Sequence, residues 1–275
     1  MRSATKVLRL FRTAVHICNA FVRVTVLFPW CSAAARRHQI ADWSRKTLSI
    51  FGLRKTTNAL PSKGGDPRLY VANHVSWLDV FAIWSQTDAI FVAKGEVGLW
   101  PVIGPLARRL GVVFIDRSRR RDAMTASRHI AALLAQGRSV CIFPEGTSTE
   151  GRELRSFHSA LFQSVVETGV AVQPIAIRYF REDGALATEA AFTGDMSLVQ
   201  SMWHLAGANP IIIEIGVLPL IDSAGLDRRI LAVRAHELIG RRLREPVNGW
   251  PLEPHNTLIS TRPFAKVTSF DPAVP

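Results

Sequence analysis

The 275-residue sequence predicts one α/β domain with a largely parallel central sheet flanked by helices, preceded by an amphipathic two-helix hairpin. Two observations predict this fold. Short apolar runs of strand length alternate with segments of helical periodicity, and polar side chains in the first thirty residues recur every three or four positions. A hydrophobic content of 48% supplies a sizeable core. We divide the chain into a helical hairpin (1–57), an α/β domain (58–250) and an irregular C-terminal tail (251–275).

The first thirty residues are expected to form a helix with a basic face. Its polar residues fall on one arc of roughly 140°; they are Arg2, Lys6, Arg9, Arg12, His16, Asn19 and Arg23. A signal peptide or membrane span is disfavoured, because Arg23 and Pro29 interrupt the stretch before the roughly 20 apolar residues that a span needs. The basic face favours a helix lying at a membrane interface. Ordinary packing of an amphipathic helix on the domain is the alternative. Residues 36–50 are predicted to form the second helix.

A change of pattern follows a Pro- and Gly-rich linker at 58–67. Apolar runs of strand length occur at 69–72, 90–93, 112–115, 139–143, 171–178 and 211–217. Helix-period segments lie at 78–85, 100–110, 120–136, 156–167 and 227–243. This alternation is typical of a parallel sheet with crossover helices.

The charge balance predicts an anionic partner. Thirty-four Lys and Arg against 22 Asp and Glu leave a net charge of +12, which suits lipid headgroups, nucleic acid or an acidic carrier protein. No nucleic-acid-binding module is recognisable and aromatic residues are only 8%, so nucleic acid is not expected. The three cysteines, Cys18, Cys31 and Cys141, are widely spaced and odd in number, which favours a reducing compartment and offers no zinc spacing.

A histidine and an aspartate stand five residues apart where the strand at 69–72 ends. The segment reads NHVSWLD and contains His74 and Asp79. Functional side chains of parallel sheets gather at such strand ends. An Asp79 carboxylate bonded to the imidazole would orient His74 as a general base. The alternative is a capping box of Ser76 and Asp79, in which Asp79 only satisfies backbone donors.

Three further segments carry candidate residues. GVVFIDR delivers Arg117 to a strand end, where a guanidinium can hold a phosphate with two hydrogen bonds; a solvated basic loop is the alternative and fits 119–121 better. In FPEGTS, Gly146 allows close backbone approach to a ligand and Glu145 is expected to hold a substrate hydroxyl, unless the segment is only an exposed turn. VQPIA carries Pro174, which is unusual in a strand away from an edge or bulge and is expected to border the site.

Together these four motifs, in this order between residues 69 and 176, resemble those of the lysophospholipid (glycerolipid) acyltransferases typified by 1-acylglycerol-3-phosphate acyltransferase. The preceding hairpin is also similar to that family. The resemblance implies that His74 and Asp79 are the catalytic pair. It also implies a set of substrate-binding residues, namely Lys94, Arg117, Glu145, Gly146 and Thr147. Many members have an arginine after EGT, whereas this chain has Ser148, and Arg152 or Arg155 is the expected substitute.

The resemblance implies transfer of a fatty acyl group from an acyl-CoA or acyl carrier protein thioester to a lysophospholipid hydroxyl. The expected acceptor is 1-acylglycerol-3-phosphate, giving phosphatidic acid, and no cofactor or metal is required. His74 would take the hydroxyl proton, and because GxSxG is absent we expect direct transfer without an acyl-enzyme. Backbone amides at the start of the helix after His74 are the expected donors to the oxyanion.

The sequence is also compatible with other functions. Within the family, the alternative acceptor is another lysolipid such as a lyso-aminolipid. A thioesterase or lipase would pass the acyl group to water instead, and a non-enzymatic binder of anionic membranes would explain the charge but not the His74 and Asp79 pair. We expect a peripheral or monotopic protein that contacts membrane lipids on the cytoplasmic face of the inner membrane. No oligomeric state is predicted.

Overall fold

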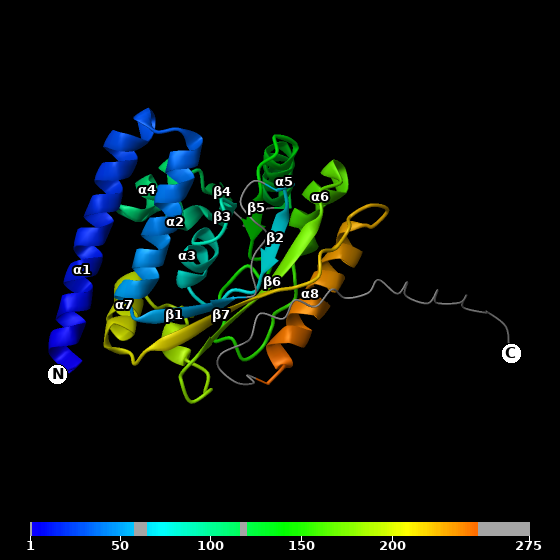
Figure 1. The fold of residues 1–275 in the computed structure, drawn as a ribbon. Coiled ribbons are helices and arrows are strands. Elements are labelled where there is room, and N and C mark those ends of the chain that lie inside the picture. The colour runs from blue at the N-terminus through cyan, green and yellow to red at the C-terminus, as the bar shows by residue number, and fades with distance from the viewer. Residues whose placement is uncertain (1, 58–64, 116–119, 247–275) are drawn as a thin grey trace, which may run out of the picture.

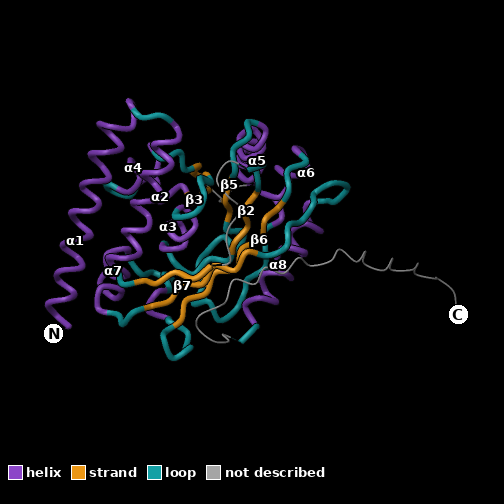
Figure 2. The backbone as a smooth tube through the Cα atoms, viewed as in Figure 1, coloured by secondary structure: helices purple, strands orange, loops and turns teal. Residues whose placement is uncertain are grey.

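A seven-stranded mixed sheet lies between two layers of helices (Figures 1 and 2). The computed structural model describes residues 2–57, 65–115 and 120–246. The strand order is β1-β7-β6-β2-β5-β3-β4, and every neighbouring pair is parallel except β6 and β7. The predicted largely parallel α/β fold is therefore confirmed.

The strands are short and mostly buried. They are β1 (Leu53–Thr57), β2 (Leu69–Ala72), β3 (Ile90–Lys94), β4 (Val113–Ile115), β5 (Val140–Ile142), β6 (Val172–Phe180) and β7 (Ile211–Val217). The helices are α1 (Arg2–Val22), α2 (Ala33–Ile50), α3 (Leu78–Trp84), α4 (Ile103–Arg109), α5 (Arg120–Ala135), α6 (Gln163–Thr168), α7 (Leu198–Gly207) and α8 (Arg228–Arg244). Strands covered by helices on both faces consist of continuous apolar runs, as β2 and β5 do.

Each face of the sheet has its own core. On one face, side chains of α2, α3 and α7, including Leu48, Leu78 and Leu205, pack against the sheet. On the other face, α5, α6 and α8 contribute residues such as Ile130 and Leu231. The hairpin therefore lies on the first face only, and α8 lies on the opposite side of the sheet (Figure 1).

Two elements were not predicted. Strand β1 pairs in parallel with β7, from Leu53 opposite Ile211 onward, so the sheet begins within the segment that we assigned to the hairpin. Its sequence, LRKTT, is polar because it forms the sheet edge, and this hides it from a search for apolar runs. Helix α7 begins with a capping box formed by Ser197 and Gln200. Residues 58–64 of the predicted linker and the whole predicted tail at 251–275 lie outside the described residues.

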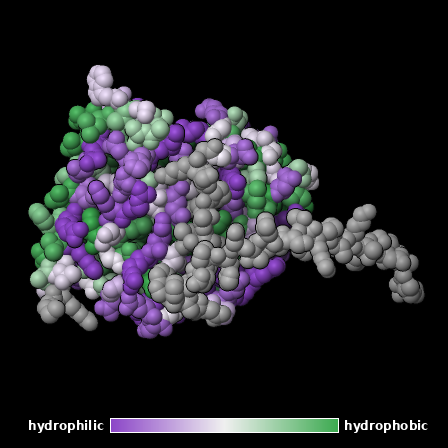
Figure 3. Space-filling model, viewed as in Figure 1, coloured by the Kyte–Doolittle hydropathy of each residue, from purple (hydrophilic) through white to green (hydrophobic). Residues whose placement is uncertain are grey.

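The polar side of α1 faces the protein. Arg9 donates from Nη1 to the carbonyl oxygens of Ala206 and Ala208, at 3.2 and 3.1 Å, and Lys6 lies 4.1 Å from the ring centroid of Trp203 in α7. The exposed large hydrophobic residues of α1 and of the helical turns up to residue 30 form an apolar strip, namely Val7, Leu8, Phe11, Val15, Phe21, Val22, Val26, Leu27 and Trp30. Hydrophobic residues accordingly line the edge of the molecule where α1 lies (Figure 3). Ordinary packing of an amphipathic helix would bury these residues instead.

Helical structure continues from α1 to Trp30 through a π-helical turn at Arg23–Leu27 and a 3₁₀ turn at Phe28–Trp30. By length and composition, residues 3–30 are sufficient to cross a membrane, and 17% of the apolar window is buried. However, α1 packs along α2 and α7 on its polar side. A helix held in this way presents only one face to lipid, which favours the predicted interfacial position.

Candidate active site

Strand β2 occupies the middle of the sheet and carries the site at its carboxyl end. All four of its residues are buried. The next residue, Asn73, donates from Nδ2 to the carbonyl oxygen of Ile177 at 2.9 Å and accepts from the N–H of Ile177 at 2.7 Å. This pair of bonds ties the end of β2 to β6, so the following loop leaves the sheet from a fixed point.

His74 and Asp79 form the predicted pair. The His74 Nδ1 atom lies 2.8 Å from Asp79 Oδ2; the imidazole is 22% exposed and the carboxylate is fully buried. Asp79 Oδ2 also accepts from the backbone N–H groups of Val75 and Ser76, at 2.8 and 2.9 Å. Ser76 Oγ accepts from Leu78 N at 3.3 Å, so only the Asp79 half of the capping box forms. Asp79 therefore contacts the imidazole and also holds the loop that carries it.

Tyr179 of β6 completes the surroundings of Asp79, although no sequence motif indicated it. Its hydroxyl donates to Asp79 Oδ1 at 2.6 Å. Burial and the adjacent Asp79 carboxylate raise the pKa of Tyr179 well above its ordinary value, so the hydroxyl keeps its proton and remains a donor. In the sequence, Tyr179 is marked only by its position: it follows Ile175 and Ile177 at every second residue of the strand, so these three side chains lie on the same face of the sheet.

Two residues of the FPEGTS turn, Phe143 and Glu145, contact His74. The Phe143 ring stacks on the imidazole, with centroids 4.1 Å apart and planes 16° apart. Glu145 is 4% exposed, and its two carboxylate oxygens accept from the backbone N–H groups of His74 and Arg155, at 2.8 and 2.9 Å. Burial raises the pKa of Glu145, and these two hydrogen bonds oppose that rise. Glu145 thus connects the histidine loop to the turn.

A mostly apolar cavity of about 480 Å³ opens beside His74. Besides His74, its lining includes Lys94, Gly146, Thr147 and Ser148, which the sequence singled out. Its walls are largely aromatic and comprise Trp43, Phe51, Trp77, Phe81, Trp84, Phe91, Trp100, Phe143 and Phe192. Two exposed carboxylates, Glu96 and Asp195, also line it. The cavity therefore combines a mostly apolar lining with His74 and a few charged groups.

Other expected site residues lie elsewhere. Arg117 falls outside the described residues. Arg152 is exposed and pairs with Glu150 at 3.0 Å, and neither it nor Arg155 lines the cavity. Ser148, which stands where many family members have arginine, donates from Oγ to the carbonyl oxygen of Phe192. Within the described part of the chain, no group of three His, Cys, Asp or Glu side chains is placed to hold a metal ion.

Two backbone amides between His74 and α3 are already hydrogen-bonded. The N–H groups of Val75 and Ser76 donate to Asp79, two or three residues before α3 begins at Leu78. These two amides are therefore not free to serve as oxyanion donors. Thr147 and Ser148 line the cavity, and their backbone N–H groups donate to no residue in the described portion.

Comparisons with known proteins agree on one family. The Acyltransferase family model matches residues 53–178. The lyso-ornithine lipid O-acyltransferase of Pseudomonas aeruginosa is 40% identical over 202 residues, covering 71% of this chain and 78% of that protein. The 1-acyl-sn-glycerol-3-phosphate acyltransferase of Neisseria meningitidis is 29% identical over 225 residues, covering 82% and 88%. The crystal structure of the 1-acyl-sn-glycerophosphate acyltransferase PlsC from Thermotoga maritima superposes with a TM-score of 0.65 at 19% identity, covering 91% of this chain and 99% of that one, which supports the fold.

Proposed function

The chain belongs to the acyltransferase family, and from this we propose that it transfers a fatty acyl group from a thioester to the hydroxyl of a lysolipid. The observation that carries the proposal is the 2.8 Å contact between His74 Nδ1 and the buried Asp79 carboxylate, at the wall of a largely apolar cavity. A base, its orienting carboxylate and a hydrophobic cavity are the groups that acyl transfer to an alcohol requires.

In the proposed mechanism, His74 acts as the general base. Asp79 accepts a hydrogen bond from Nδ1–H, so the neutral imidazole keeps its proton on Nδ1 and its Nε2 atom can take the proton of the acceptor hydroxyl. The hydroxyl oxygen attacks the thioester carbonyl carbon, a tetrahedral intermediate forms, and its collapse breaks the carbon–sulfur bond. The proton on His74 is then passed to the departing thiolate. The acceptor itself is the nucleophile, so no acyl-enzyme forms.

The oxyanion of this intermediate needs donors close to His74. We assign this role to the backbone N–H groups of Thr147 and Ser148, which line the same cavity and donate to no described residue. The left-handed backbone of Gly146, with φ of +78°, turns the chain immediately before them. Donors held in advance at the position of a developing charge stabilise the transition state without reorganisation.

Two acceptors fit the family, and the charged residues of the cavity distinguish them. Lysophosphatidic acid presents an anionic phosphate, for which Lys94 and Arg117 are the proposed contacts. A lyso-ornithine lipid presents one carboxylate and one ammonium. The carboxylates of Glu96 and Asp195, which line the cavity together with Lys94, favour this zwitterion, and Ser148 stands where a cation would favour a phosphate.

The first experiment is transfer of a labelled acyl group from acyl-CoA and from acyl carrier protein to both lysolipids. Wild type is compared with His74→Ala, which we expect to lower turnover about 10²- to 10⁴-fold while leaving the protein folded. A Glu96→Gln, Asp195→Asn double variant should raise the KM for the lyso-ornithine lipid without raising that for lysophosphatidic acid. Full activity in folded His74→Ala would contradict the mechanism, and thiol release without an acceptor would indicate a thioesterase.

We also propose that the enzyme works from the cytoplasmic face of the membrane. Both candidate donors are intracellular thioesters, and the odd cysteine count suits a reducing compartment. The exposed apolar strip of α1 would enter the lipid, while the basic residues beside it would meet anionic headgroups.

A further inference from the structure

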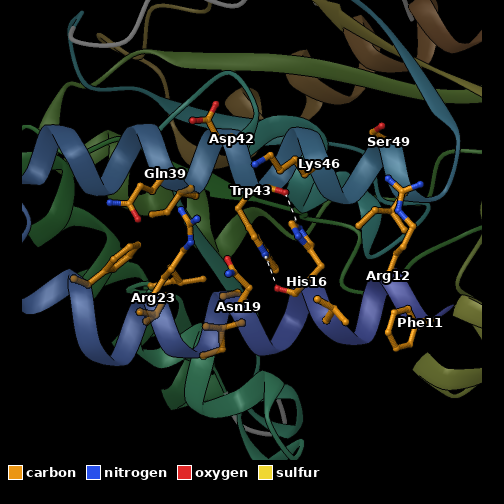
Figure 4. Close-up of a pocket in the computed structure, with 18 residues that line it drawn as sticks. Phe11, Arg12, His16, Asn19, Arg23, Gln39, Asp42, Trp43, Lys46 and Ser49 are labelled. Carbon is orange, nitrogen blue, oxygen red and sulfur yellow. Dashed lines mark hydrogen bonds between the residues drawn. The ribbon is translucent and has the colours of Figure 1, made fainter. Parts of the chain in front are cut away.

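A second cavity, of about 540 Å³, lies between the two helices of the hairpin. We call it the hairpin groove; polar side chains of Arg12, Asn19, Arg23, Gln39 and Lys46 are part of its lining. Figure 4 shows Arg12, Asn19 and Arg23 extending towards α2 from the helical stretch that begins with α1. The groove adjoins the cavity beside His74 and shares His16, Trp43, Leu106 and Leu110 with it, but His74 and the FPEGTS turn do not line the groove.

The groove carries uncompensated positive charge. Arg12, Arg23 and Lys46 are exposed at its walls, and none of the three forms an ion pair within the described residues. The one carboxylate in its lining, Asp42, is already paired with Arg45 and lies 3.2 Å from His38. Lys46 and Arg23 both act on His16 in the groove, whereas Arg12 lies 11 residues before Arg23, about 16 Å along the helix. Cations that line a concave surface attract an anion more strongly than the same charges dispersed over a convex surface.

His16 also lines the groove and contacts α2. Its ring stacks on Trp43, with centroids 5.0 Å apart, and its Nε2 atom lies 3.1 Å from both the Trp43 carbonyl oxygen and Thr47 Oγ1. Burial lowers the pKa of His16, and Lys46 and Arg23 lower it further. The imidazole is therefore neutral, and the positive charge available to a ligand is that of the arginines and the lysine.

The groove is continuous with the exposed apolar strip of α1. Phe11 and Val15, which are 65% and 53% exposed, belong to the strip and also line the groove. Residues three or four apart are neighbours on a helix surface, so Arg12 lies beside Leu8 and Val15 of the strip. Arg23 directly follows Val22 and also lies next to the strip. When the strip lies in the acyl region of a bilayer, these guanidinium groups lie at the level of the lipid phosphates.

We propose that the hairpin groove binds the phosphodiester headgroup of an anionic glycerophospholipid of the bilayer. Arg23 and Lys46, the two cations that act on His16, hold the phosphate, Arg12 adds positive charge at the other end of the groove, and the acyl chains follow Phe11 and Val15. This lipid is neither donor nor acceptor in acyl transfer. It sets the depth and rotation of the hairpin on the membrane.

The test compares two full-length variants that each lose three positive charges. The groove variant is Arg12→Gln, Arg23→Gln, Lys46→Gln. Its matched control is Arg229→Gln, Arg234→Gln, Arg241→Gln, which removes exposed arginines from α8 on the opposite side of the sheet. Partitioning is measured by flotation with three kinds of vesicle: phosphatidylcholine, phosphatidylcholine with phosphatidylglycerol, and phosphatidylcholine with oleate at equal negative charge.

We expect the groove variant to lose about tenfold or more in partitioning onto phosphatidylglycerol vesicles, since each basic residue near an anionic surface contributes about fivefold. The control variant should bind those vesicles almost as wild type does, and all three proteins should bind phosphatidylcholine equally. Wild type should prefer phosphatidylglycerol to oleate vesicles. Equal losses in both triple variants, or no preference over oleate, would reduce the effect to general charge attraction and overturn the proposal. Displacement by inorganic phosphate at constant ionic strength would assign the groove to free phosphate instead.

Discussion

At the scale of single residues, Asp79 is the side chain on which the site depends. One carboxylate oxygen accepts from the His74 imidazole and from two backbone amides, and the other accepts from Tyr179. The two sequence hypotheses for Asp79, orientation of the base and satisfaction of backbone donors, therefore describe one arrangement. Both could be anticipated because His74, Ser76 and Asp79 are neighbours in sequence. Tyr179 could not, since its contact joins residues 100 positions apart.

Asp79→Asn should lower both turnover and stability. Asparagine cannot accept all four hydrogen bonds, so we expect turnover to fall about 10²-fold or more and the free energy of unfolding to fall by about 1–3 kcal/mol. Ser76→Ala is the control, because it removes only the acceptor for Leu78 N and should cost about 1 kcal/mol with near-normal turnover. Acyl-transfer kinetics and thermal unfolding measure both effects. Equal turnover in the two variants would mean that Asp79 serves the loop alone.

Tyr179→Phe tests whether the second oxygen of Asp79 matters for catalysis. The change removes one donor to a buried carboxylate, and we expect turnover to fall roughly tenfold, with about 1–3 kcal/mol of stability lost. The other tyrosine of the chain provides the control, since Tyr70 is buried in β2 and its hydroxyl donates to no described residue. Tyr70→Phe should leave turnover unchanged. If the KM of the acceptor rises instead while kcat is constant, Tyr179 acts on binding rather than on the base.

At the scale of secondary structure elements, the buried strands and their crossover helices were predictable because their residues are apolar and regularly spaced. β1 was not, because the polar LRKTT segment is recognisable as a strand only when β7 is beside it. The orientation of α1 depends on its environment in the same way. Its periodicity establishes that two faces exist, but the contacts of Lys6 and Arg9 with α7 determine which face turns outward.

The outward apolar face of α1 leads to a prediction about membrane binding. Phe11→Glu places a charge in the exposed strip, and we expect partitioning onto neutral phosphatidylcholine vesicles to fall about tenfold or more, since burial of a phenylalanine contributes about 1.5–3 kcal/mol. Val233→Glu is the control, because Val233 is also more than half exposed but lies on α8. Flotation assays at equal protein concentration compare the two. An equal loss in both variants would show that added negative charge, rather than the strip, is responsible.

At the scale of the whole molecule, hydrophobic and electrostatic attraction act on the same side of the protein. The apolar strip faces outward along α1, the hairpin groove adjoins it, and the aromatic cavity beside His74 reaches α1 and α2 through Thr13, His16 and Trp43. Residues of the hairpin thus contribute to both cavities. This arrangement would allow an acyl chain to pass between the bilayer and the cavity beside His74 without crossing water, which the low solubility of such chains favours.

The two attractions respond differently to salt, and this separates them in the intact protein. The net charge of +12 should draw the chain to vesicles containing phosphatidylglycerol, and raising sodium chloride from about 0.05 to 0.5 M should weaken that binding roughly tenfold or more, because exposed charges are screened. The fraction of protein bound to phosphatidylcholine vesicles should stay constant or increase slightly, because burial of the apolar strip does not depend on charge. Flotation assays at several salt concentrations measure how binding to each kind of vesicle changes with salt. If binding to the neutral vesicles also collapsed with salt, the exposed apolar strip would not be the surface that enters the membrane.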